Sequence, residues 1–204
     1  SKYRVLLSEF SFSIFPNEIV GIVGESGSGK SLTALSIAGL LSDSKLKVES
    51  KKMQLGENDL SKLSQKDWES TRGRNLGMVF QEPQSSLNPS MRCGIQVMER
   101  LQKFEKADKK INVAKVLSAF NEVQLPKPER VFNAYPHELS GGQKQRVMIV
   151  MALICKPQLL IADEPTTALD VSVQKEILSL IKNQQKINKM SILFISHDLS
   201  LISQ

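Results

Sequence analysis

The sequence predicts an α/β protein built on a mostly parallel β-sheet. Short apolar runs typical of buried strands recur along the 204 residues and alternate with segments of helical character. These strand-like runs cover residues 19–23, 76–80, 158–164 and 191–195. Strands that alternate with helices favour a parallel sheet. Residues 91–124 show apolar spacings of three and four and no strand signal, so we expect them to form an inserted α-helical subdomain.

The composition indicates a folded protein and excludes a disordered or membrane-spanning chain. Hydrophobic residues make up 41% and charged residues 24% of the sequence. No apolar run is long enough to cross a bilayer and no signal peptide is visible, so we expect a soluble or peripheral protein. The net charge of +6 suits an anionic partner, but the lysines are scattered as on a solvated surface, and no nucleic-acid partner is expected. Cys93 and Cys155 have no metal-type spacing and are expected to be reduced cysteines of a cytosolic protein.

The first sixty residues are expected to contribute two strands, a helix and a small β arm. Residues 10–14 alternate like a half-buried strand, and Pro16-Asn17 predicts a turn before the strand at 19–23. The apolar stretch 32–41 is long enough for a helix. The polar segment 42–60 contains a turn at 56–59 and is expected to form a small antiparallel arm.

A glycine-rich loop joins the strand at 19–23 to that helix. It reads Gly24-Glu25-Ser26-Gly27-Ser28-Gly29-Lys30-Ser31, with Leu32 opening the helix, and it matches G-x-x-x-x-G-K-[ST]. Glycines let the backbone approach a phosphate closely, and the N–H groups of the loop and the helix N-terminus then face the anion. Lys30 suits the β- and γ-phosphates and Ser31 suits Mg²⁺, as in a P-loop NTPase (RecA-like) core. The alternative is a glycine-rich turn with a chance lysine.

Polar residues follow the other strand-like runs. Gln81, Asp163 and His197 each come at or just after the end of one, and the carboxyl ends of parallel strands meet at one edge of a sheet. Asp163 is a candidate ligand of Mg²⁺, and its neighbour Glu164 can face the water that attacks the γ-phosphate. Gln81 could contact the metal or that water, and His197 the γ-phosphate. Turn contacts for the acids, a surface role for Gln81 and a structural role for His197 are the alternatives.

The order of the motifs carries a family resemblance. Leu139-Ser140-Gly141-Gly142-Gln143, placed between the glycine loop and Asp163-Glu164, resembles the signature of ABC-type ATPases. The same order continues with Ala168-Leu169-Asp170 and a histidine after the last strand, so the resemblance covers essentially the whole chain. It implies that Gln81 is the Q-loop glutamine, Asp170 the D-loop aspartate and His197 the switch histidine.

The resemblance also implies the cofactors ATP and Mg²⁺ and a division of roles among the site residues. Glu164, His197, Gln81 and Lys30 would take part in catalysis. Ser31, Gln81 and Asp163 would hold Mg²⁺. ATP would contact Gly24 to Leu32 of its own chain, while Ser140, Gly141, Gly142 and Gln143 would complete the site of a second ABC ATPase domain, in a homodimer or a heterodimer.

A finer match points to importers. Phe80-Gln81-Glu82-Pro83, the run from Tyr135 to Gly142 and the run from Ala162 to Asp170 are similar to the ATPase subunits of oligopeptide, dipeptide and nickel importers. This implies an energy-coupling subunit that is peripheral on the cytoplasmic face of the inner membrane. Its partners would be transmembrane permease subunits, contacted by the inserted helices and the Gln81 loop, and indirectly a solute-binding protein.

The expected organisation is a single ABC ATPase domain over residues 1–204. Residues 1–85 and 156–204 would form the ATP-binding α/β core, and residues 86–155 the helical subdomain with the signature. The family has an aromatic residue upstream of the P-loop that stacks on adenine, and Tyr3 is the nearest candidate. Because the importer subunits continue beyond the histidine loop, we expect a trimmed domain or one half of a two-ATPase polypeptide.

Two other classes remain as alternatives. The first is a non-transport ABC ATPase of DNA repair, chromosome maintenance or translation. A member of the chromosome-maintenance class would carry long heptad coiled coils between P-loop and signature, and the sequence shows none, whereas the translation class stays open. A nucleotide-binding regulator without turnover is the second, and Glu164 argues against it. The sequence does not identify the transported solute, because other subunits choose it.

Overall fold

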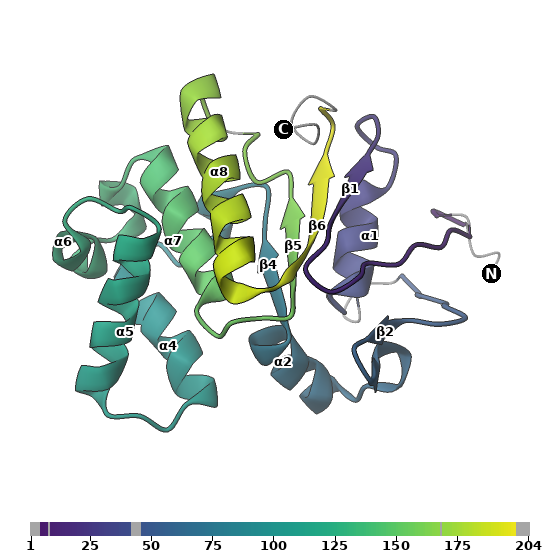
Figure 1. Cartoon of the computed structure of the whole chain (residues 1–204), viewed down its shortest axis with the longest axis horizontal. Coiled ribbons are helices and arrows are strands. Elements are labelled where there is room, and N and C mark those ends of the chain that lie inside the picture. The colour runs from purple at the N-terminus through teal and green to yellow at the C-terminus, as the bar shows by residue number, and fades with distance from the viewer. Residues whose placement is uncertain (1–4, 8, 42–45, 168, 199–204) are drawn as a thin grey trace.

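The protein is built around a four-stranded parallel sheet, seen in a computed structural model that describes residues 5–7, 9–41, 46–167 and 169–198 (Figure 1). The sheet has the order β1 (Ile19–Val23), β6 (Ser191–Ser196), β5 (Leu159–Asp163) and β4 (Leu76–Val79). All neighbouring strands run parallel, and Val23 pairs with Ser196 while Asp163 pairs with Ile195. The carboxyl ends of the strands therefore lie at one edge, and the predicted α/β fold class is confirmed.

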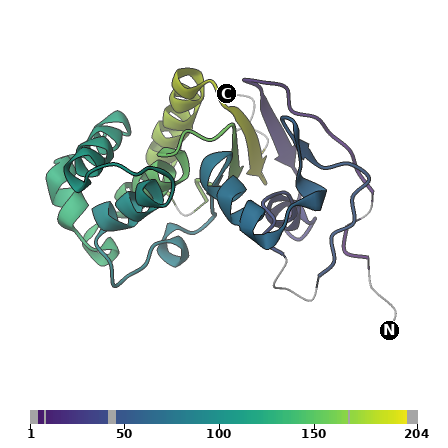
Figure 2. The same cartoon turned by 90° about the horizontal axis from the view of Figure 1, so that it is seen from below.

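Alternate residues of the central strands pack on opposite faces of the sheet. Leu160 and Ile192 belong to a large apolar cluster, whereas Ile161 and Leu193 belong to a second, smaller cluster with Ala34 of α1 (Lys30–Ile37). Helices lie on both sides of the sheet when the molecule is viewed from below (Figure 2). Burial of both faces explains why these strands read as continuous apolar runs in the sequence.

Glycine ends α1 earlier than the sequence suggested. The expected helix covers residues 32–41, but Ala38 is the C-cap and Gly39 follows with φ of 64°. A side chain is disfavoured at such an angle, and a Cβ at Gly39 would lie 2.5 Å from the ring of Trp68. Trp68 belongs to α2 (Gln65–Arg74), a helix that the sequence pattern did not predict and that begins with a capping box of Ser64 and Asp67.

The strand expected at residues 10–14 is wrong. Residues 9–15 are described and contain no strand, and the rings of Phe10 and Phe12 stack on each other at the surface with centroids 5.9 Å apart. The alternation of apolar residues was present, but a strand also needs a neighbour for its backbone groups, and β1 pairs only with β6 among the described strands. The small antiparallel arm is confirmed as β2 (Gln54–Leu55) and β3 (Asn58–Asp59), joined by a turn at Gly56.

Helices fill the region between β4 and β5, at one end of the molecule (Figure 1). As expected from apolar spacing, two of the longer ones lie within residues 91–124. The helices of the region are α3 (Pro83–Ser86), α4 (Cys93–Phe104), α5 (Lys109–Glu122), α6 (Pro128–Asn133) and α7 (Gly141–Leu153), with a 3₁₀ turn at Pro136–Glu138. Pro128 opens α6, at a helix position where a missing N–H costs nothing. The last helix, α8 (Val171–Asn188), leads into β6.

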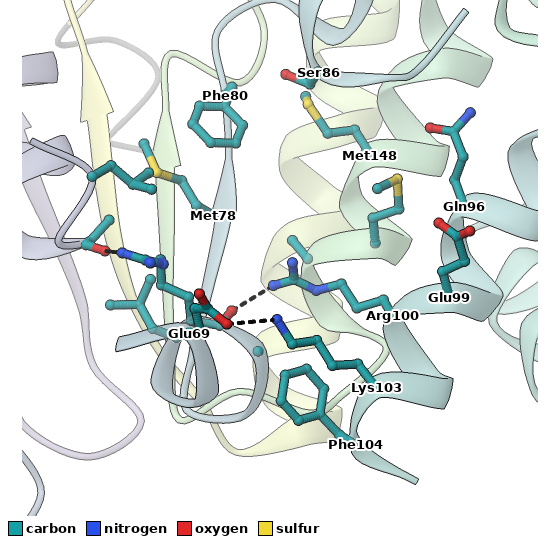
Figure 3. Close-up of a pocket in the computed structure, with 17 residues that line it drawn as sticks. Glu69, Met78, Phe80, Ser86, Gln96, Glu99, Arg100, Lys103, Phe104 and Met148 are labelled. Atoms are coloured by element: carbon teal, nitrogen blue, oxygen red, sulfur yellow. Dashed lines mark hydrogen bonds and ion pairs between the residues drawn. The ribbon is translucent and has the colours of Figure 1, made fainter. Parts of the chain in front are cut away.

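A groove of about 480 Å³ is lined by residues of α2, β4, α4 and α7 (Figure 3). Its apolar lining includes Met78, Phe80 and Met148, and Glu69, Arg100 and Lys103 stand among its charged residues. Lys103 pairs with Glu69 across the groove at 3.6 Å, and Arg100 donates to the backbone oxygen of Arg72 at 2.6 Å. The groove thus combines apolar and charged surface.

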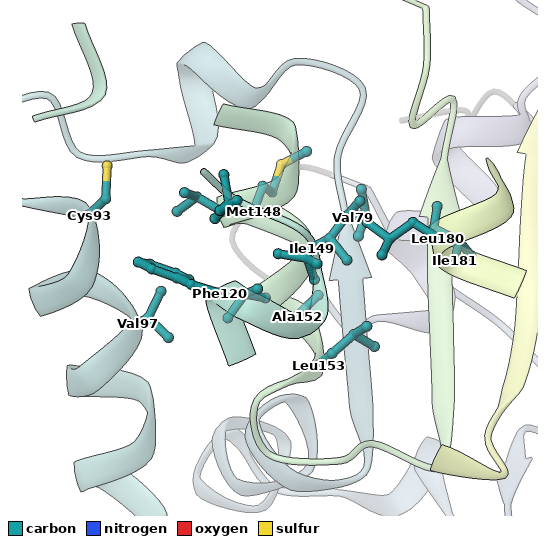
Figure 4. Close-up of a cluster of buried hydrophobic side chains, with 14 of the residues drawn as sticks. Val79, Cys93, Val97, Phe120, Met148, Ile149, Ala152, Leu153, Leu180 and Ile181 are labelled. Atoms are coloured by element: carbon teal, nitrogen blue, oxygen red, sulfur yellow. The ribbon is translucent and has the colours of Figure 1, made fainter. Parts of the chain in front are cut away.

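One apolar cluster connects the helical region to the sheet (Figure 4). Phe120 of α5 is fully buried beside Val97 of α4, and Ile149 of α7 continues the cluster toward Val79 of β4 and Ile181 of α8. Helix α7 therefore packs on both the helical region and the sheet.

None of the described helices has the length and apolarity needed to cross a membrane. Both cysteines are free, and burial raises the pKa of the Cys93 thiol to about 11.

Candidate nucleotide site

The glycine loop lies between β1 and α1 and needs its glycines for two different reasons. Gly27 and Gly29 have φ of 80° and 93°, in the left-handed region that disfavours a side chain. Gly24 has no such angle, but a Cβ there would lie 2.9 Å from Ser28 Oγ. The loop therefore depends on glycine both for backbone conformation and for close packing.

Lys30 is buried at the start of α1, and its ammonium group is directed back toward the loop. Lys30 Nζ donates to the backbone oxygens of Gly24 and Glu25 at 2.8 and 2.9 Å. It also lies 3.9 Å from Glu164 Oε1. A positive charge is therefore held in reach of both the loop and the end of β5.

Ser31 and Asp163 join α1 to the end of β5. Ser31 Oγ donates to Asp163 Oδ1 at 3.2 Å, although 132 residues separate them in sequence. Burial raises the pKa of the Asp163 carboxyl and Glu164 adds to the rise, while the Ser31 hydrogen bond and Lys30 act in the opposite direction. A hydroxyl and a carboxylate this close, both of them oxygen donors, fit a magnesium ion that also takes phosphate oxygens.

Glu164 is the residue on which the other polar side chains converge. Its Oε2 lies 3.1 Å from Gln81 Nε2, 3.1 Å from His197 Nδ1 and 2.9 Å from Thr167 Oγ1. The side chain is only 12% exposed and borders a cavity of about 90 Å³ next to Thr167 and His197. Glu164 also has φ of 45°, a strained angle for a residue other than glycine.

The structure thus gathers most of the predicted site residues at the carboxyl edge of the sheet. Lys30, Gln81 and His197 contact Glu164, and Ser31 contacts the neighbouring Asp163. Their roles in binding and catalysis stay predictions. The proposed adenine-stacking residue, Tyr3, lies outside the described residues.

Thr167 was not singled out by the sequence. It donates to both the carboxylate and the backbone oxygen of Glu164, at 2.9 and 3.3 Å. The only sequence signal for this contact is that a threonine stands three residues after Glu164. The signal is weak, because the contact depends on the path of the loop.

The predicted signature forms the N-terminus of α7. Ser140 caps α7, with its Oγ accepting from Gln143 N at 3.3 Å and its own N donating to Gln143 Oε1 at 3.1 Å. A Cβ at Gly142 would lie 3.1 Å from Val173 Cγ1, so this glycine borders the start of α8. A Cβ at Gly141 would lie 3.7 Å from Leu169 Cδ2, so the signature borders the loop that leads into α8. In Figure 1, α7 and α1 lie on opposite sides of the sheet's central strands.

Asp170, the predicted D-loop aspartate, caps α8. Its Oδ1 accepts from Val173 N at 3.0 Å and from Ser172 Oγ at 2.8 Å. These hydrogen bonds, the backbone one first, hold the pKa of the Asp170 carboxyl below its ordinary value. Asp170 thus has a clear structural role in addition to the predicted one.

The family model described as "ABC transporter" matches residues 7–167. This chain belongs to the ABC transporter family. The family resemblance inferred from the order of the motifs is therefore confirmed, and the glycine loop and the carboxylates at the end of β5 lie within the matched residues.

Relatives and solved structures agree with the family. The chain is 42% identical to the dipeptide transport ATP-binding protein DppD of Escherichia coli (strain K12), over 97% of this chain and 60% of that protein. It is 45% identical to the oligopeptide transport ATP-binding protein OppD of Bacillus subtilis (strain 168), over 95% of this chain and 54% of that protein. The structure matches a dimeric post-hydrolysis state of the ATP-binding cassette MJ0796 bound to ADP and Pi, with a TM-score of 0.83, 27% identity, and 96% and 82% of the two chains covered. The chain spans about 60% or less of the length of these two transport proteins.

Proposed function

We propose that this chain is the ATP-binding and hydrolysing domain of an ABC importer, with a peptide as the transported solute. The observation that carries the proposal is the cluster at Glu164, where a carboxylate held by Gln81, Thr167 and His197 lies beside the buried Lys30. The names of the relatives, which are dipeptide and oligopeptide transport proteins, support a peptide importer over an ATPase of DNA maintenance or translation. The domain would act on the cytoplasmic face of the inner membrane.

Each residue of the cluster has a chemical task in this proposal. The loop N–H groups and Lys30 would hold the phosphates of ATP, and Ser31 and Asp163 would supply oxygen ligands for Mg²⁺, whose charge would offset that of the phosphates. Glu164 accepts a proton from the attacking water and orients it for in-line attack. Gln81 and His197 keep that carboxylate in place and contact the γ-phosphate side of the site.

The test is Glu164→Gln in the full-length protein. The amide keeps the size of the side chain and removes its ability to accept a proton, so hydrolysis should fall by about 10²-fold or more. ATP binding should persist, and an ATP-bound dimer should accumulate. Phosphate release gives the rate, calorimetry the affinity, and Glu129→Gln on α6 serves as a control for the loss of one carboxylate. Near-normal hydrolysis by Glu164→Gln would refute the assignment.

A second copy or a related subunit would complete each site. Ser140 to Gln143 present a helix N-terminus suited to phosphate, yet they lie against α8, away from the chain's own glycine loop. A dimer in which each signature serves the partner's ATP gives both loops a use. The dimeric ADP-bound cassette among the similar structures supports this arrangement.

The groove between α2 and α4 is the proposed docking site for a permease segment. Its apolar residues and charged side chains suit an amphipathic segment, and it is bordered by Phe80, next to Gln81 (Figure 3). Leu40, which is 38% exposed, also lines it. Leu40→Arg should abolish most transport while sparing ATP hydrolysis by the purified domain. Ile187→Arg, a matched change of an exposed apolar residue on α8, should spare both, and equal transport by the two variants would contradict the docking site.

The division into subdomains follows from the same function. Residues 1–85 and 156–204 would form the nucleotide-binding core, and residues 86–155 the helical part that carries the signature and faces the permease. The shared apolar cluster along α7 would let the two parts move together when a second domain binds.

A further inference from the structure

Gln145 forms a buried link between the signature helix and the loop that carries Glu164. Its side chain is 1% exposed, although glutamine is rarely so buried. Its Nε2 donates to the backbone oxygen of Pro165 at 2.6 Å, across 20 residues of sequence. Gln145 lies in the first turns of α7, two residues after the last residue of the signature.

The acceptor of this bond belongs to a strained stretch of backbone. Glu164, directly before Pro165, has φ of 45°, a left-handed backbone conformation that is unfavourable for a residue with a Cβ. Such a conformation persists only where neighbours fix it. On one side Glu164 N donates to Ile195 O of β6 at 2.9 Å, and on the other the Gln145 amide holds the carbonyl of Pro165, in the peptide that joins Pro165 to Thr166.

Packing adds a second connection between the signature helix α7 and the loop after Glu164, by way of α8. Gly142 approaches Val173 of α8 so closely that a Cβ would lie 3.1 Å from Val173 Cγ1. Gln174, the residue directly after Val173, donates to the backbone oxygens of Thr166 and Leu169 at 3.1 and 3.0 Å. The loop after Glu164 is therefore held between α7 and α8, and a shift of the signature helix must move it.

We propose that Gln145 is a positioning residue that couples the signature to the Glu164 of the same chain. The inference rests on the proposed function, in which the signature contacts the ATP of the neighbouring domain. Occupation of that neighbouring site fixes the N-terminus of α7, Gln145 transmits the position of α7 to the Pro165 peptide, and the Glu164 carboxylate is aligned for its own ATP. The two sites of a dimer are linked through this bond.

The first variant is Gln145→Met in the full-length protein, which keeps the length of the side chain and removes the N–H donor. ATP affinity at the glycine loop should stay within about twofold, because the bond is remote from the phosphates. The kcat for hydrolysis should fall about fivefold or more, the size expected when a buried acceptor loses its donor. The dependence of the rate on ATP should also lose its cooperativity, with the Hill coefficient falling toward that of independent sites.

A second variant separates positioning from general packing. Gln145→Glu can donate to Pro165 O only while its carboxyl is protonated, so its activity relative to wild type should rise as the pH is lowered. Gln184→Met removes a different buried glutamine, near the other end of α8, and should leave kcat and cooperativity unchanged. Unchanged kcat in Gln145→Met, or an equal loss in Gln184→Met, overturns the inference.

Amide hydrogen exchange gives a readout that needs no turnover. Gln145→Met should speed exchange over residues 163–167, whereas Gln184→Met should not. If the wild-type protein fails to hydrolyse ATP, the proposed function is refuted, and the exchange result still decides whether Gln145 holds this loop. Equal exchange in wild type and Gln145→Met refutes the positioning role itself.

Discussion

A mixing experiment tests the composite site most directly. Lys30→Ala removes the buried ammonium of one glycine loop, and Ser140→Arg places a bulky charge at the tip of the signature. Each variant alone should be inactive if every ATP needs an intact glycine loop from one chain and an intact signature from the other. In a mixed dimer the two defects fall in one site, and the second site carries neither.

The expected recovery can be calculated. Random pairing of equal amounts gives about half mixed dimers, and each of these has one intact site of two, so hydrolysis should return to at most about a quarter of the wild-type rate, and to less than that if Gln145 couples the two sites. The measurement is phosphate release against mixing ratio, with a maximum at equal amounts. If the natural partner is a different subunit, one substitution goes into each subunit.

The control addresses the loss of a helix cap. Ser140 begins α7 with a capping box, and its replacement costs about 1 kcal/mol of stability for that reason alone. Ser64 begins α2 with the same kind of box, made with Asp67, so Ser64→Arg has a matched cost away from the signature. Ser64→Arg should remain active. If mixed dimers are shown to form and hydrolysis still never exceeds that of the two inactive variants, the idea that one intact composite site of a dimer can hydrolyse ATP is refuted.

Three further predictions follow from burial at the site and in the core. Lys30→Ala should weaken ATP binding about 10- to 150-fold, the equivalent of a charge-assisted contact of about 1.5–3 kcal/mol, and unchanged affinity in calorimetry would contradict the phosphate-binding loop. The pKa of Asp163 is raised in the folded protein, so ionisation of this carboxyl lowers the free energy of unfolding as the pH rises above its ordinary pKa of 3.8. Asp163→Asn should therefore have a higher Tm than wild type at pH 7, and the difference should shrink toward pH 4. A difference in Tm that stays constant between pH 7 and pH 4 would mean that another effect is responsible. Phe120→Ala, at a fully buried position, should cost about 3–5 kcal/mol in urea unfolding, against about 0.5 kcal/mol or less for Ile111→Ala, which is half-exposed on the same helix; similar costs would place Phe120 outside the core.

The sequence predicted the elements whose signal is local and strong. Residues 158–164 had to be a buried strand because a long apolar run with two terminal acids fits little else, and the structure gives β5 there. Helix α2 escaped prediction because it buries little apolar surface, and its one sequence signal is the pair Ser64 and Asp67. The strand expected at residues 10–14 failed because alternation specifies a face to bury but does not supply a neighbouring strand.

The same distinction applies to the candidate site. Parallel strands bring their carboxyl ends to one edge, so the proximity of Gln81, Asp163 and His197 follows from topology once the strands are known. Thr167 and Gln145 could not be found in this way. Their contacts depend on the path of the loop after β5, and this path depends on the left-handed backbone conformation of Glu164. Glycine would have signalled such a conformation in the sequence, but glutamate does not.

Energetically unfavourable features gather at the end of β5, at Asp163 and Glu164, and their position supports the proposed function. Two adjacent carboxylates end a buried strand, burial raises the pKa of one, and the other adopts a strained backbone angle. A protein selected only for stability would have replaced Glu164 with glycine or with a neutral residue, since either change relieves strain or charge repulsion. Instead, Lys30, Gln81, Thr167, His197 and, through Pro165, Gln145 hold this carboxylate in place. The rest of the fold offsets this cost, and the result is a carboxylate fixed beside the glycine loop, which fits the proposed hydrolysis of ATP.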